Sequence, residues 1–199
     1  EALEETMLRL DQYESVYEDV LAIPVLRGQK PPHDKFPGAK TTTTVEALMP
    51  DGKSVQGATS HHLGQSFAEA FDITFSDVDE TERTAHTTSW GISWRCLGAL
   101  IMTHSDEQGL VLPPTVAPEQ VVVVPIWQAD TKEDVLEYAE GVAEDLEEAG
   151  IRVELDDRDE HNPGFKFNEH ELHGVPLRIE IGPNEVEDGE LTLVHRPDG

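Results

Sequence analysis

The sequence predicts an α+β protein in two parts. The first is an antiparallel sheet with helices on one face, and the second is a small α/β domain with a mixed sheet over residues 118–199. The first part alternates β-branched runs with hairpin signals such as Asp51-Gly52. The second part opens with a continuous β-branched run, Gln120–Ile126, typical of a strand buried on both faces. Between them lies the proline-stiffened segment Gly109–Pro118, so we expect the first domain to cover residues 1–117.

The first part is expected to begin with a helix over residues 1–22, because apolar residues recur there at helical spacing between carboxylates. The Gly/Pro/Lys-rich stretch Gly28–Gly38 is expected to be a loop. The remaining elements are a strand at 41–49, its hairpin partner at 53–58, a short helix at 63–71, strands at 72–77 and 84–92, and a helix at 94–104. Antiparallel hairpins with helices on one face are typical of the α+β class.

The second part continues with a strongly acidic helix over residues 132–149, with apolar residues on one side and Gly150 at its end. The patterning then predicts a strand at 151–155, a helix at 165–173, and strands at 175–181 and 190–194. This order of strands and helices indicates a small α/β domain with a mixed sheet.

The charge of the chain is strongly negative and excludes several classes of protein. Its 199 residues contain 41 Asp+Glu against 14 Lys+Arg, giving a formal net charge of −27 and a pI near 4.4. A basic nucleic-acid-binding domain is excluded as a description of the whole chain, because this field repels phosphate. An acidic, lysine-poor, folded chain indicates adaptation to high salt, where the Debye length falls to about 3 Å at 1 M. The alternative is an ordinary acidic protein.

The acidity is unevenly distributed. Residues 83–105 contain Arg83 and Arg95 and no carboxylate, and basic residues outnumber acidic ones from Leu21 to Glu46. In so acidic a chain, these stretches indicate surfaces that a polyanion can approach.

Cys96 is the single cysteine, which excludes an intrachain disulfide and a cysteine-based zinc site within these residues. No apolar run approaches the roughly 18 residues of a membrane span, and the N-terminus does not resemble a signal peptide, so we expect a soluble cytoplasmic protein. The chain starts at Glu1 without Met and stops soon after a strand-like segment, so we expect it to be a fragment.

The segment Gln56–Gln65 has the residue types of a polar pocket wall. It ends a strand with small and hydroxyl residues, and we expect it to place His61 and His62 at the mouth of a helix. Small residues let a ligand approach the backbone, and a helix N-terminus favours an anion. The alternative is a capped helix with incidental histidines. A zinc site is disfavoured, because the scattered His and Cys residues lack a metal-binding spacing.

The segment Ser89–Leu100 runs from a strand into an apolar helix with Arg95 at the junction. A lone arginine there is costly unless it is paired or bound to an anion. Its planar guanidinium suits a phosphate and can also stack on a purine ring. The alternative is a structural ion pair with a distant carboxylate.

These segments together resemble class II aminoacyl-tRNA synthetases, and specifically the prolyl enzymes of the archaeal and eukaryotic type. Gly91-Ile-Ser-Trp-Arg95 resembles class II motif 3. The similarity extends in order through Lys35–Ala39 with Thr42–Ala47, Gln56–Gln65, Gly109–Pro118 and Gly164–Pro183, and so covers nearly the whole chain. The resemblance implies a portion of the class II catalytic domain, built on an antiparallel sheet, followed by an anticodon-binding domain.

The resemblance also implies roles for particular residues. Arg95 would hold the ATP γ-phosphate and pack on adenine, and the ATP site would comprise Gln56, Thr59, Ser93, Trp94 and Arg95. His61 would belong to the proline pocket, with Phe36 as an apolar wall for the pyrrolidine ring. The proline carboxylate would attack the ATP α-phosphate, and arginines with ATP-bound Mg²⁺ would offset the growing charge.

The chain departs from the family pattern in three ways. Motifs 1 and 2 have no match, and residues 1–22 resemble the helix that follows motif 2. The zinc-binding C-terminal domain of archaeal-type enzymes is also without a match, because the chain has a single cysteine. Ser93-Trp94 stands where Thr-Thr is more usual before the motif 3 arginine.

By the same resemblance, the second domain would read the anticodon. Lys166 and Arg178 are nearly the only basic residues in the neutral stretch 161–180. Phe165 or Phe167 could stack an unpaired base, as recognition of single-stranded RNA often requires, or could pack in the core instead.

The sequence is therefore interpreted as part of a halophilic ligase that joins L-proline to tRNA(Pro) through a prolyl-adenylate. We expect ATP with Mg²⁺, L-proline and tRNA(Pro) as ligands, a homodimer in the full-length protein, no metal held by protein side chains, and no DNA or membrane partner. Two alternatives stay open. One is a tRNA-binding module or synthetase paralogue without catalysis, and the other is a different class II synthetase, such as the threonyl or glycyl enzyme.

Overall fold

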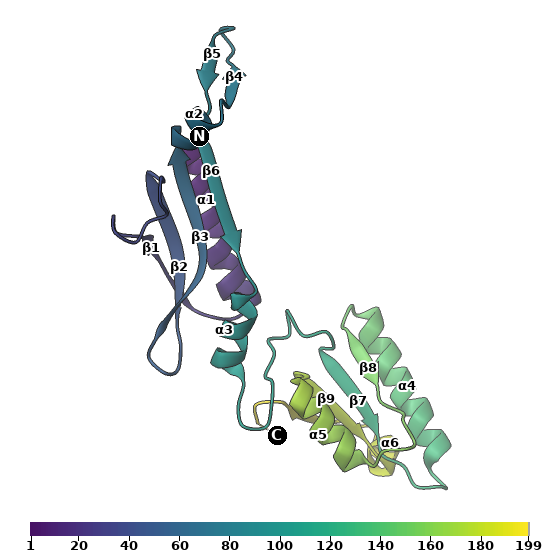
Figure 1. Ribbon diagram of the computed structural model, residues 1–199. Coiled ribbons are helices and arrows are strands. Elements are labelled where there is room, and N and C mark those ends of the chain that lie inside the picture. The colour runs from purple at the N-terminus through teal and green to yellow at the C-terminus, as the bar shows by residue number, and fades with distance from the viewer. Residues whose placement is uncertain (199) are drawn as a thin grey trace. The chain divides into compact units, whose positions relative to one another are not determined.

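The first 103 residues fold on a four-stranded antiparallel sheet with the strand order β1-β2-β3-β6 (Figure 1). The computed structural model describes residues 1–198. The strands are β1 (Val25–Gln29), β2 (Thr41–Leu48), β3 (Ser54–Gly64) and β6 (Thr87–Ile92). A turn containing Gly52, whose φ of 80° suits glycine, joins β2 to β3, as the Asp51-Gly52 signal predicts. The predicted antiparallel sheet is confirmed.

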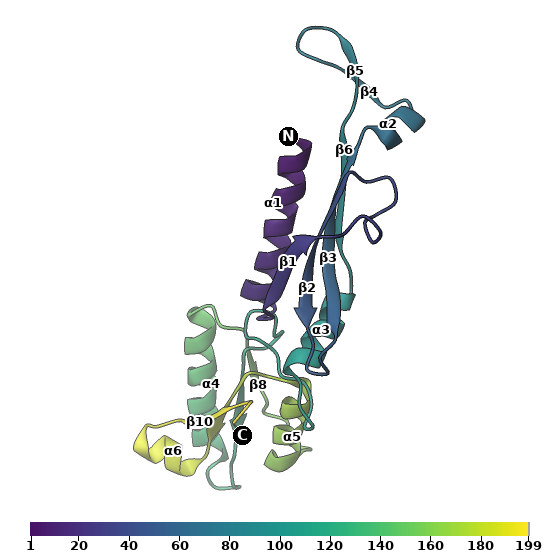
Figure 2. The same cartoon turned by 90° about the vertical axis from the view of Figure 1, so that its left-hand side faces the viewer.

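One long helix lies along this sheet (Figure 2). Helix α1 (Ala2–Ser15) continues directly into a π-helical turn, η1 (Val16–Val20), so the helix predicted over residues 1–22 is present with a widened last turn. Leu10, Tyr13 and Tyr17 are buried on its inner face. The π-turn admits an extra residue, which changes the direction of the side chains that follow it.

The other elements of this unit lie at the ends of the sheet. They are α2 (Ser66–Ala70), the two-stranded hairpin β4 (Thr74–Ser76) and β5 (Glu82–Thr84), and α3 (Arg95–His104), which follows β6. Figure 2 shows the β4–β5 hairpin extending beyond β6.

Two predictions in this unit are wrong. Residues 25–29 form the edge strand β1, although the stretch from Gly28 was expected to be a loop. Strand β3 reaches Gly64, whereas the prediction ended it at residue 58 and began a helix at residue 63. In both cases strand pairing explains the difference, because β2 bonds β1 on one side and β3 on the other, and β3 bonds β6 through His62. Such non-local hydrogen bonds are invisible to local sequence patterns.

The second unit, His104–Gly199, contains a mixed sheet with the strand order β10-β9-β7-β8. Strand β7 (Val121–Pro125) is central and parallel to both β8 (Val153–Leu155) and β9 (Leu177–Ile181), while β10 (Thr192–His195) is antiparallel to β9. The helices are α4 (Lys132–Glu148), α5 (Pro163–His173) and α6 (Pro183–Asp188). The predicted mixed sheet is confirmed, and α6 is an element that the sequence analysis missed.

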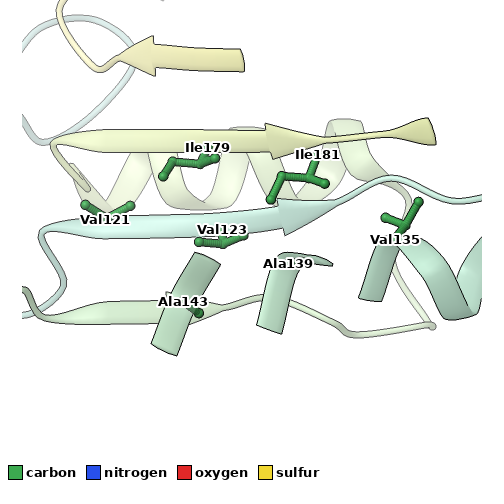
Figure 3. Close-up of a cluster of buried hydrophobic side chains, with 7 residues drawn as sticks. All are labelled: Val121, Val123, Val135, Ala139, Ala143, Ile179 and Ile181. Atoms are coloured by element: carbon green, nitrogen blue, oxygen red, sulfur yellow. The ribbon is translucent and has the colours of Figure 1, made fainter. Parts of the chain in front are cut away.

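The core of this unit lies between the sheet and α4. Figure 3 shows apolar side chains of β7, β9 and α4 gathered there, namely Val121, Val123, Val135, Ala139, Ala143, Ile179 and Ile181. Val122 and Val124 point to the other face of the sheet and pack with Val175 and Phe167. Strand β7 is therefore buried on both faces, as its continuous β-branched run predicts.

The compact units divide after Thr103, whereas the sequence analysis placed a boundary near residue 117. The intervening segment is bonded to the second unit. Asp106 receives two hydrogen bonds from the buried Arg196 at 2.8 and 2.9 Å, and Arg152 donates to the carbonyl oxygens of Pro114 and Ala117, each at 2.8 Å. The prolines stiffen this segment but do not separate it from the second unit.

Candidate functional site

The two faces of the first sheet carry different side chains. Arg27 of β1 bonds Glu14 of α1, and the Arg9 guanidinium of α1 lies 4.5 Å from the ring centroid of Trp90 of β6, so these strand residues point toward α1. Residues in alternate positions therefore point to the face opposite α1. Cross-strand pairs on that opposite face include Thr42 with His61 and Thr44 with Thr59.

A β-bulge changes this alternation in the middle of β3. Val45 pairs with Ala58 and Glu46 pairs with Gln56, so Gly57 is an extra residue. A Cβ on Gly57 would meet the Tyr17 ring, so Gly57 faces α1. Gln56 and Thr59 are an odd number of residues apart and would face opposite ways in a regular strand. The bulge turns both toward the face opposite α1.

Arg95 lies at the start of α3, and its side chain returns to β3. Its Nη1 donates a hydrogen bond to the carbonyl oxygen of Gln56 at 3.2 Å. Within residues 1–198 no carboxylate lies in ion-pair range of Arg95, so the structural ion pair considered from the sequence is not present. The guanidinium is largely exposed and is held at the sheet by a neutral acceptor. It therefore keeps its charge available for an anion.

The two residues before Arg95 are also exposed. The Oγ of Ser93 accepts a long hydrogen bond of 3.4 Å from the Arg95 backbone N–H, and the indole of Trp94 is 84% exposed. The structure thus brings Gln56 into contact with Arg95, next to Ser93 and Trp94, and places Thr59 on the same face of the sheet as Gln56. A large exposed aromatic ring beside a guanidinium is suited to stacking on a planar ligand.

His61 and Phe36 form a second cluster on this face. Their ring centroids are 4.9 Å apart, and the His61 Nδ1 lies 3.0 Å from the Thr42 hydroxyl. That hydroxyl already accepts a bond from the Phe36 backbone N–H, so it has its proton free to donate to Nδ1. Burial lowers the pKa of His61. The cluster therefore favours a neutral imidazole with its proton on Nε2, where it can donate to a ligand oxygen.

The predicted position of the two adjacent histidines is wrong. Both lie within β3 and point to opposite faces, because side chains alternate along a strand. His62 lies 5.8 Å from His86 between ring centroids, away from the His61 cluster. The helix that follows, α2, begins only at Ser66 and has five residues. The histidines are therefore not at a helix mouth.

Lys166 occupies a different environment from the one predicted for it. It is 2% exposed, and its ammonium donates to the Asp156 carbonyl oxygen at 2.8 Å. The Lys166 ammonium is therefore not at the surface, where RNA would contact it, and the predicted RNA contact of Lys166 stays a prediction. The Lys166 ammonium also lies 3.6 Å from a carboxylate oxygen of the buried Asp156.

Asp156 is the centre of that buried network. Its carboxylate accepts bonds from Arg158 at 2.7 and 2.8 Å and lies 2.8 Å from the His170 Nε2. Burial would raise the pKa of Asp156, but the hydrogen bonds from Arg158 and His170 and the charge of Lys166 outweigh it and hold that pKa well below its usual range. Asp156 is therefore ionised and structural.

Phe165 and Arg178, the other two residues predicted to contact RNA, lie in different surroundings. Phe165 is 45% exposed and stacks on His161 with ring centroids 4.2 Å apart and planes tilted by 23°. Arg178 is half-buried, bonds Glu180 at 2.9 Å and lies over the Phe167 ring at 4.3 Å. The His161–Phe165 pair is an exposed aromatic surface at the start of α5, whereas Phe167 packs in the core.

The sequence analysis missed two residues that shape the site. Thr42 orients His61, and Gly57 forms the bulge that aligns Gln56 with Thr59. A glycine inside a β-branched strand is typical of a bulge, and this is the signal by which Gly57 could have been found. Nothing distinguished Thr42 from its neighbours, Thr41, Thr43 and Thr44.

Within residues 1–198 no group of three or more His, Cys, Asp or Glu side chains is arranged to hold a metal ion. In the same residues, no helix has the length and apolar character needed to cross a membrane.

Comparisons with known proteins match both units. Residues 120–199 match the family described as "Anticodon binding domain". The chain is 87% identical over 198 residues to the Proline–tRNA ligase of Halorubrum lacusprofundi, and 78% identical over 199 residues to that of Haloquadratum walsbyi. It is 52% identical over 199 residues to the Proline–tRNA ligase of Rubrobacter xylanophilus. Each match covers 100% of this chain.

The chain spans 39–42% of the length of these curated relatives. The matches confirm the resemblance to the prolyl enzymes along the whole chain, and the relatives are aminoacyl-tRNA ligases by name. The high-identity relatives come mostly from halophilic archaea, which agrees with the high-salt origin that the composition indicates.

Proposed function

We propose that this chain takes part in the ATP-dependent attachment of L-proline to tRNA(Pro). Residues 1–117 would form a portion of a class II catalytic domain, and residues 118–199 would form the anticodon-binding domain. The observation that carries this proposal is the 87% identity over the whole chain to a relative named Proline–tRNA ligase. The proposal covers the activity of the whole protein, including the expected homodimer.

The nucleotide would bind at the end of β3, where Gln56 and Arg95 meet. Arg95 would hold a terminal phosphate, because its guanidinium is exposed, charged and free of a carboxylate partner within residues 1–198. Trp94 is suited to lie against the adenine ring, and Ser93 and Thr59 would supply hydroxyl groups. Mg²⁺ would arrive on the ATP phosphates and add to the neutralisation of their charge.

Proline would bind beside the His61–Phe36 cluster. The Phe36 ring offers an apolar surface to the pyrrolidine ring, and the neutral His61 can donate from Nε2 to a carboxylate oxygen. The Thr42 hydroxyl would hold the imidazole in the required tautomer. This cluster and Arg95 lie on the same strand-and-helix framework, which fixes proline and ATP relative to each other.

The reaction would proceed in two steps. A proline carboxylate oxygen attacks the α-phosphorus of ATP, a new P–O bond forms, and the bond to the β-phosphate oxygen breaks to release pyrophosphate. A hydroxyl of the tRNA 3′-terminal ribose then attacks the prolyl carbonyl and releases AMP. Arg95 would stabilise the charge that collects on the leaving pyrophosphate, and this contribution comes from positioning and electrostatics without a side-chain acid–base pair.

The second unit would bind the anticodon loop chiefly through shape and stacking. The exposed His161–Phe165 pair is suited to stack on an unpaired base, and Arg178, which lies over the Phe167 ring, would make a separate contact. Lys166 would act indirectly, by holding α5 to Asp156.

Proline-dependent ATP–pyrophosphate exchange, measured in molar KCl on the protein expressed from the complete gene, tests the proposal. We expect exchange with proline, and a loss of at least about 100-fold in Arg95→Ala. Arg83→Ala is the matched control, because Arg83 pairs with Asp77 and Asp79 on the β4–β5 hairpin and should leave exchange unchanged.

The other outcomes separate the alternatives. Exchange with threonine or glycine in place of proline would assign a different class II synthetase. Binding of tRNA(Pro) without exchange for any amino acid would assign a non-catalytic tRNA-binding protein. Near-normal exchange by Arg95→Ala would remove Arg95 from the site.

A further inference from the structure

Tyr17 is a buried residue outside the site described so far. It lies in the π-helical turn η1, is 0% exposed, and is one of the largest fully buried side chains of the protein. Its hydroxyl has no hydrogen-bond partner within residues 1–198. A buried hydroxyl without a partner is unfavourable, so the packing of the ring must compensate for it.

The Tyr17 ring fills the space that a side chain at position 57 would occupy. A Cβ on Gly57 would lie 2.6 Å from Tyr17 Cζ and 2.8 Å from both Cε2 and Oη. Real Cβ atoms do not approach other atoms so closely, and the ring is locked in a core that cannot move aside cheaply. Gly57 has no positive φ, so this contact alone excludes a larger residue there.

Gly57 is the extra residue of the β-bulge, and the bulge determines which way its neighbours face. Because of it, Gln56 and Thr59 share the face opposite α1, and the Gln56 carbonyl accepts from Arg95 at 3.2 Å. Removing or moving the bulge would turn one of these side chains away and would displace the acceptor that holds Arg95.

We propose that Tyr17 is a positioning residue for the nucleotide site: its ring packs on Gly57, holds the bulge in β3, and so sets Gln56, Thr59 and the Arg95 guanidinium in place. This inference rests on the proposed function for its effect on ATP, but the Tyr17–Gly57 contact itself does not depend on it. The widened turn η1, which follows α1, brings Tyr17 to this point.

Pairs of substitutions at positions 17 and 57 test the contact by shape. Gly57→Ala introduces the clash with Cζ. Tyr17→Phe keeps Cζ and Cε2, so it cannot relieve that clash, whereas Tyr17→Leu removes both atoms and the hydroxyl. The Gly57→Ala/Tyr17→Leu double variant should therefore recover the nucleotide site of the wild type, and the Gly57→Ala/Tyr17→Phe double variant should not. Gly28→Ala is the matched control, because a Cβ there meets nothing within 4 Å.

The first measurement is the KM for ATP in proline-dependent exchange. We expect Gly57→Ala to raise it at least about tenfold while the KM for proline changes less than about twofold, because His61 lies beyond the bulge. The Leu double variant should return to within about threefold of the wild type. Tyr17→Phe alone should leave both constants unchanged, since it removes only the unpartnered hydroxyl.

The second measurement needs no nucleotide. Cys96 follows Arg95 at the start of α3, so the rate at which a thiol reagent labels the peptide that contains Cys96, measured by mass spectrometry, reports on the position of that turn. Gly57→Ala should change this rate, with rescue by Tyr17→Leu and none by Tyr17→Phe.

Equal behaviour of the two double variants in both measurements would overturn the inference, as would an unchanged KM for ATP in Gly57→Ala. Absence of exchange in the wild type, together with the expected pattern of Cys96 reactivity, would overturn the proposed function and leave the structural contact standing.

Discussion

The two units of this chain bury different kinds of polar group. The first unit buries hydroxyl groups, those of Thr6, Thr42, Thr43, Thr44 and Ser60. The second unit buries ionisable groups, those of Asp156, Lys166, His170 and Arg196. A buried hydroxyl needs one hydrogen bond, whereas a buried charge needs a partner of opposite sign and further hydrogen bonds.

The buried threonine hydroxyls of the first unit bond to nearby backbone, whereas the Ser60 hydroxyl has no partner within residues 1–198. Thr43 Oγ1 donates to the Ser60 carbonyl oxygen and Thr44 Oγ1 donates to the Ala58 carbonyl oxygen, each at 3.1 Å. These bonds tie β2 to β3 without using charge. The carboxylate-free region around Arg95 therefore remains available for a ligand anion.

The second unit uses its cations internally. Each of its six Lys and Arg residues contacts a carboxylate or a backbone carbonyl of the same unit, and these residues are Lys132, Arg152, Arg158, Lys166, Arg178 and Arg196. In a chain of net charge −27, cations are scarce, and this unit uses them to hold its own structure. An RNA-binding role of this unit would therefore depend on surfaces other than a basic patch.

The largest expected effect comes from removing the buried carboxylate. Asp156→Ala leaves Lys166 and Arg158 without their partner, and we expect it to lower the free energy of unfolding of the second unit by about 3–5 kcal/mol. Urea unfolding in molar KCl, followed by Trp127 fluorescence in a Trp90→Phe/Trp94→Phe background, measures this.

The matched control for that experiment is Asp159→Ala. Asp159 pairs with Lys132 at the surface, and exposed pairs contribute about 0–1 kcal/mol. Equal destabilisation by Asp156→Ala and Asp159→Ala would contradict the claim that the second unit depends on its buried charges.

The second prediction contrasts the pH dependence of the units. Burial raises the pKa of Tyr17 to about 12 from 10.0, so between these values the unfolded chain has lost a proton that the folded first unit retains. The free energy of unfolding should therefore fall by up to about 1.4 kcal/mol per pH unit above pH 10, and Tyr17→Phe should reduce that slope.

The second unit should respond on the acid side. Hydrogen bonds from Arg196 lower the pKa of Asp106, and the pKa of Asp156 is also depressed, so both carboxylates stay ionised in the folded state below the unfolded value of 3.8. Their contribution to the free energy of unfolding of the second unit is present above pH 4 and is lost as the pH falls further.

The fluorescence of a Trp127→Phe variant reports unfolding of the first unit, and that of the Trp90→Phe/Trp94→Phe variant reports unfolding of the second. Equal destabilisation of both units between pH 10 and pH 12 would contradict the assignment of the alkaline effect to Tyr17 in the first unit.

The smallest expected effect concerns salt. Because the cations of the second unit are engaged internally, binding of the tRNA(Pro) anticodon stem-loop should release few counterions. We expect the slope of log K against log [KCl] to be shallower than about −1.4, which corresponds to two single-strand phosphate contacts at roughly −0.7 each. Phe165→Leu should weaken binding without changing this slope. A slope as steep as that of a basic RNA-binding protein would contradict the comparison.

Much of the fold was predictable because its elements have strong local signals. The run Gln120–Ile126 and the amphipathic helices at residues 2–15 and 132–148 have patterns that only one kind of element satisfies. The edge strand β1 and the extension of β3 were missed, because their pairing partners lie elsewhere in the chain. Helix α6 is six residues long, too short for a periodic pattern to identify.

The candidate site was predictable by residue type but not by geometry. Residue types indicated Arg95, His61 and Phe36, and the structure brings His61 to Phe36 and Arg95 to Gln56. The bulge at Gly57 was not predictable in position, because strand register depends on which residues pair. The burial of Lys166 was not predictable, because a sequence does not reveal that a cation and Asp156 are buried together.

The π-turn at Val16–Val20 has a consequence for how this protein can vary. Because the π-turn holds one residue more than an α-turn, a single deletion within η1 is absorbed by closing it to an α-turn. A deletion between Tyr13 and η1 would instead rotate the preceding helix by about 100° relative to the sheet. Leu10 and Tyr13 would then leave the interior, and Arg9 would leave Trp90. Substitutions on the outer face of α1 leave the direction of its buried side chains unchanged, whereas insertions and deletions within α1 change it. The length of α1, Ala2–Ser15, is therefore more constrained than its composition.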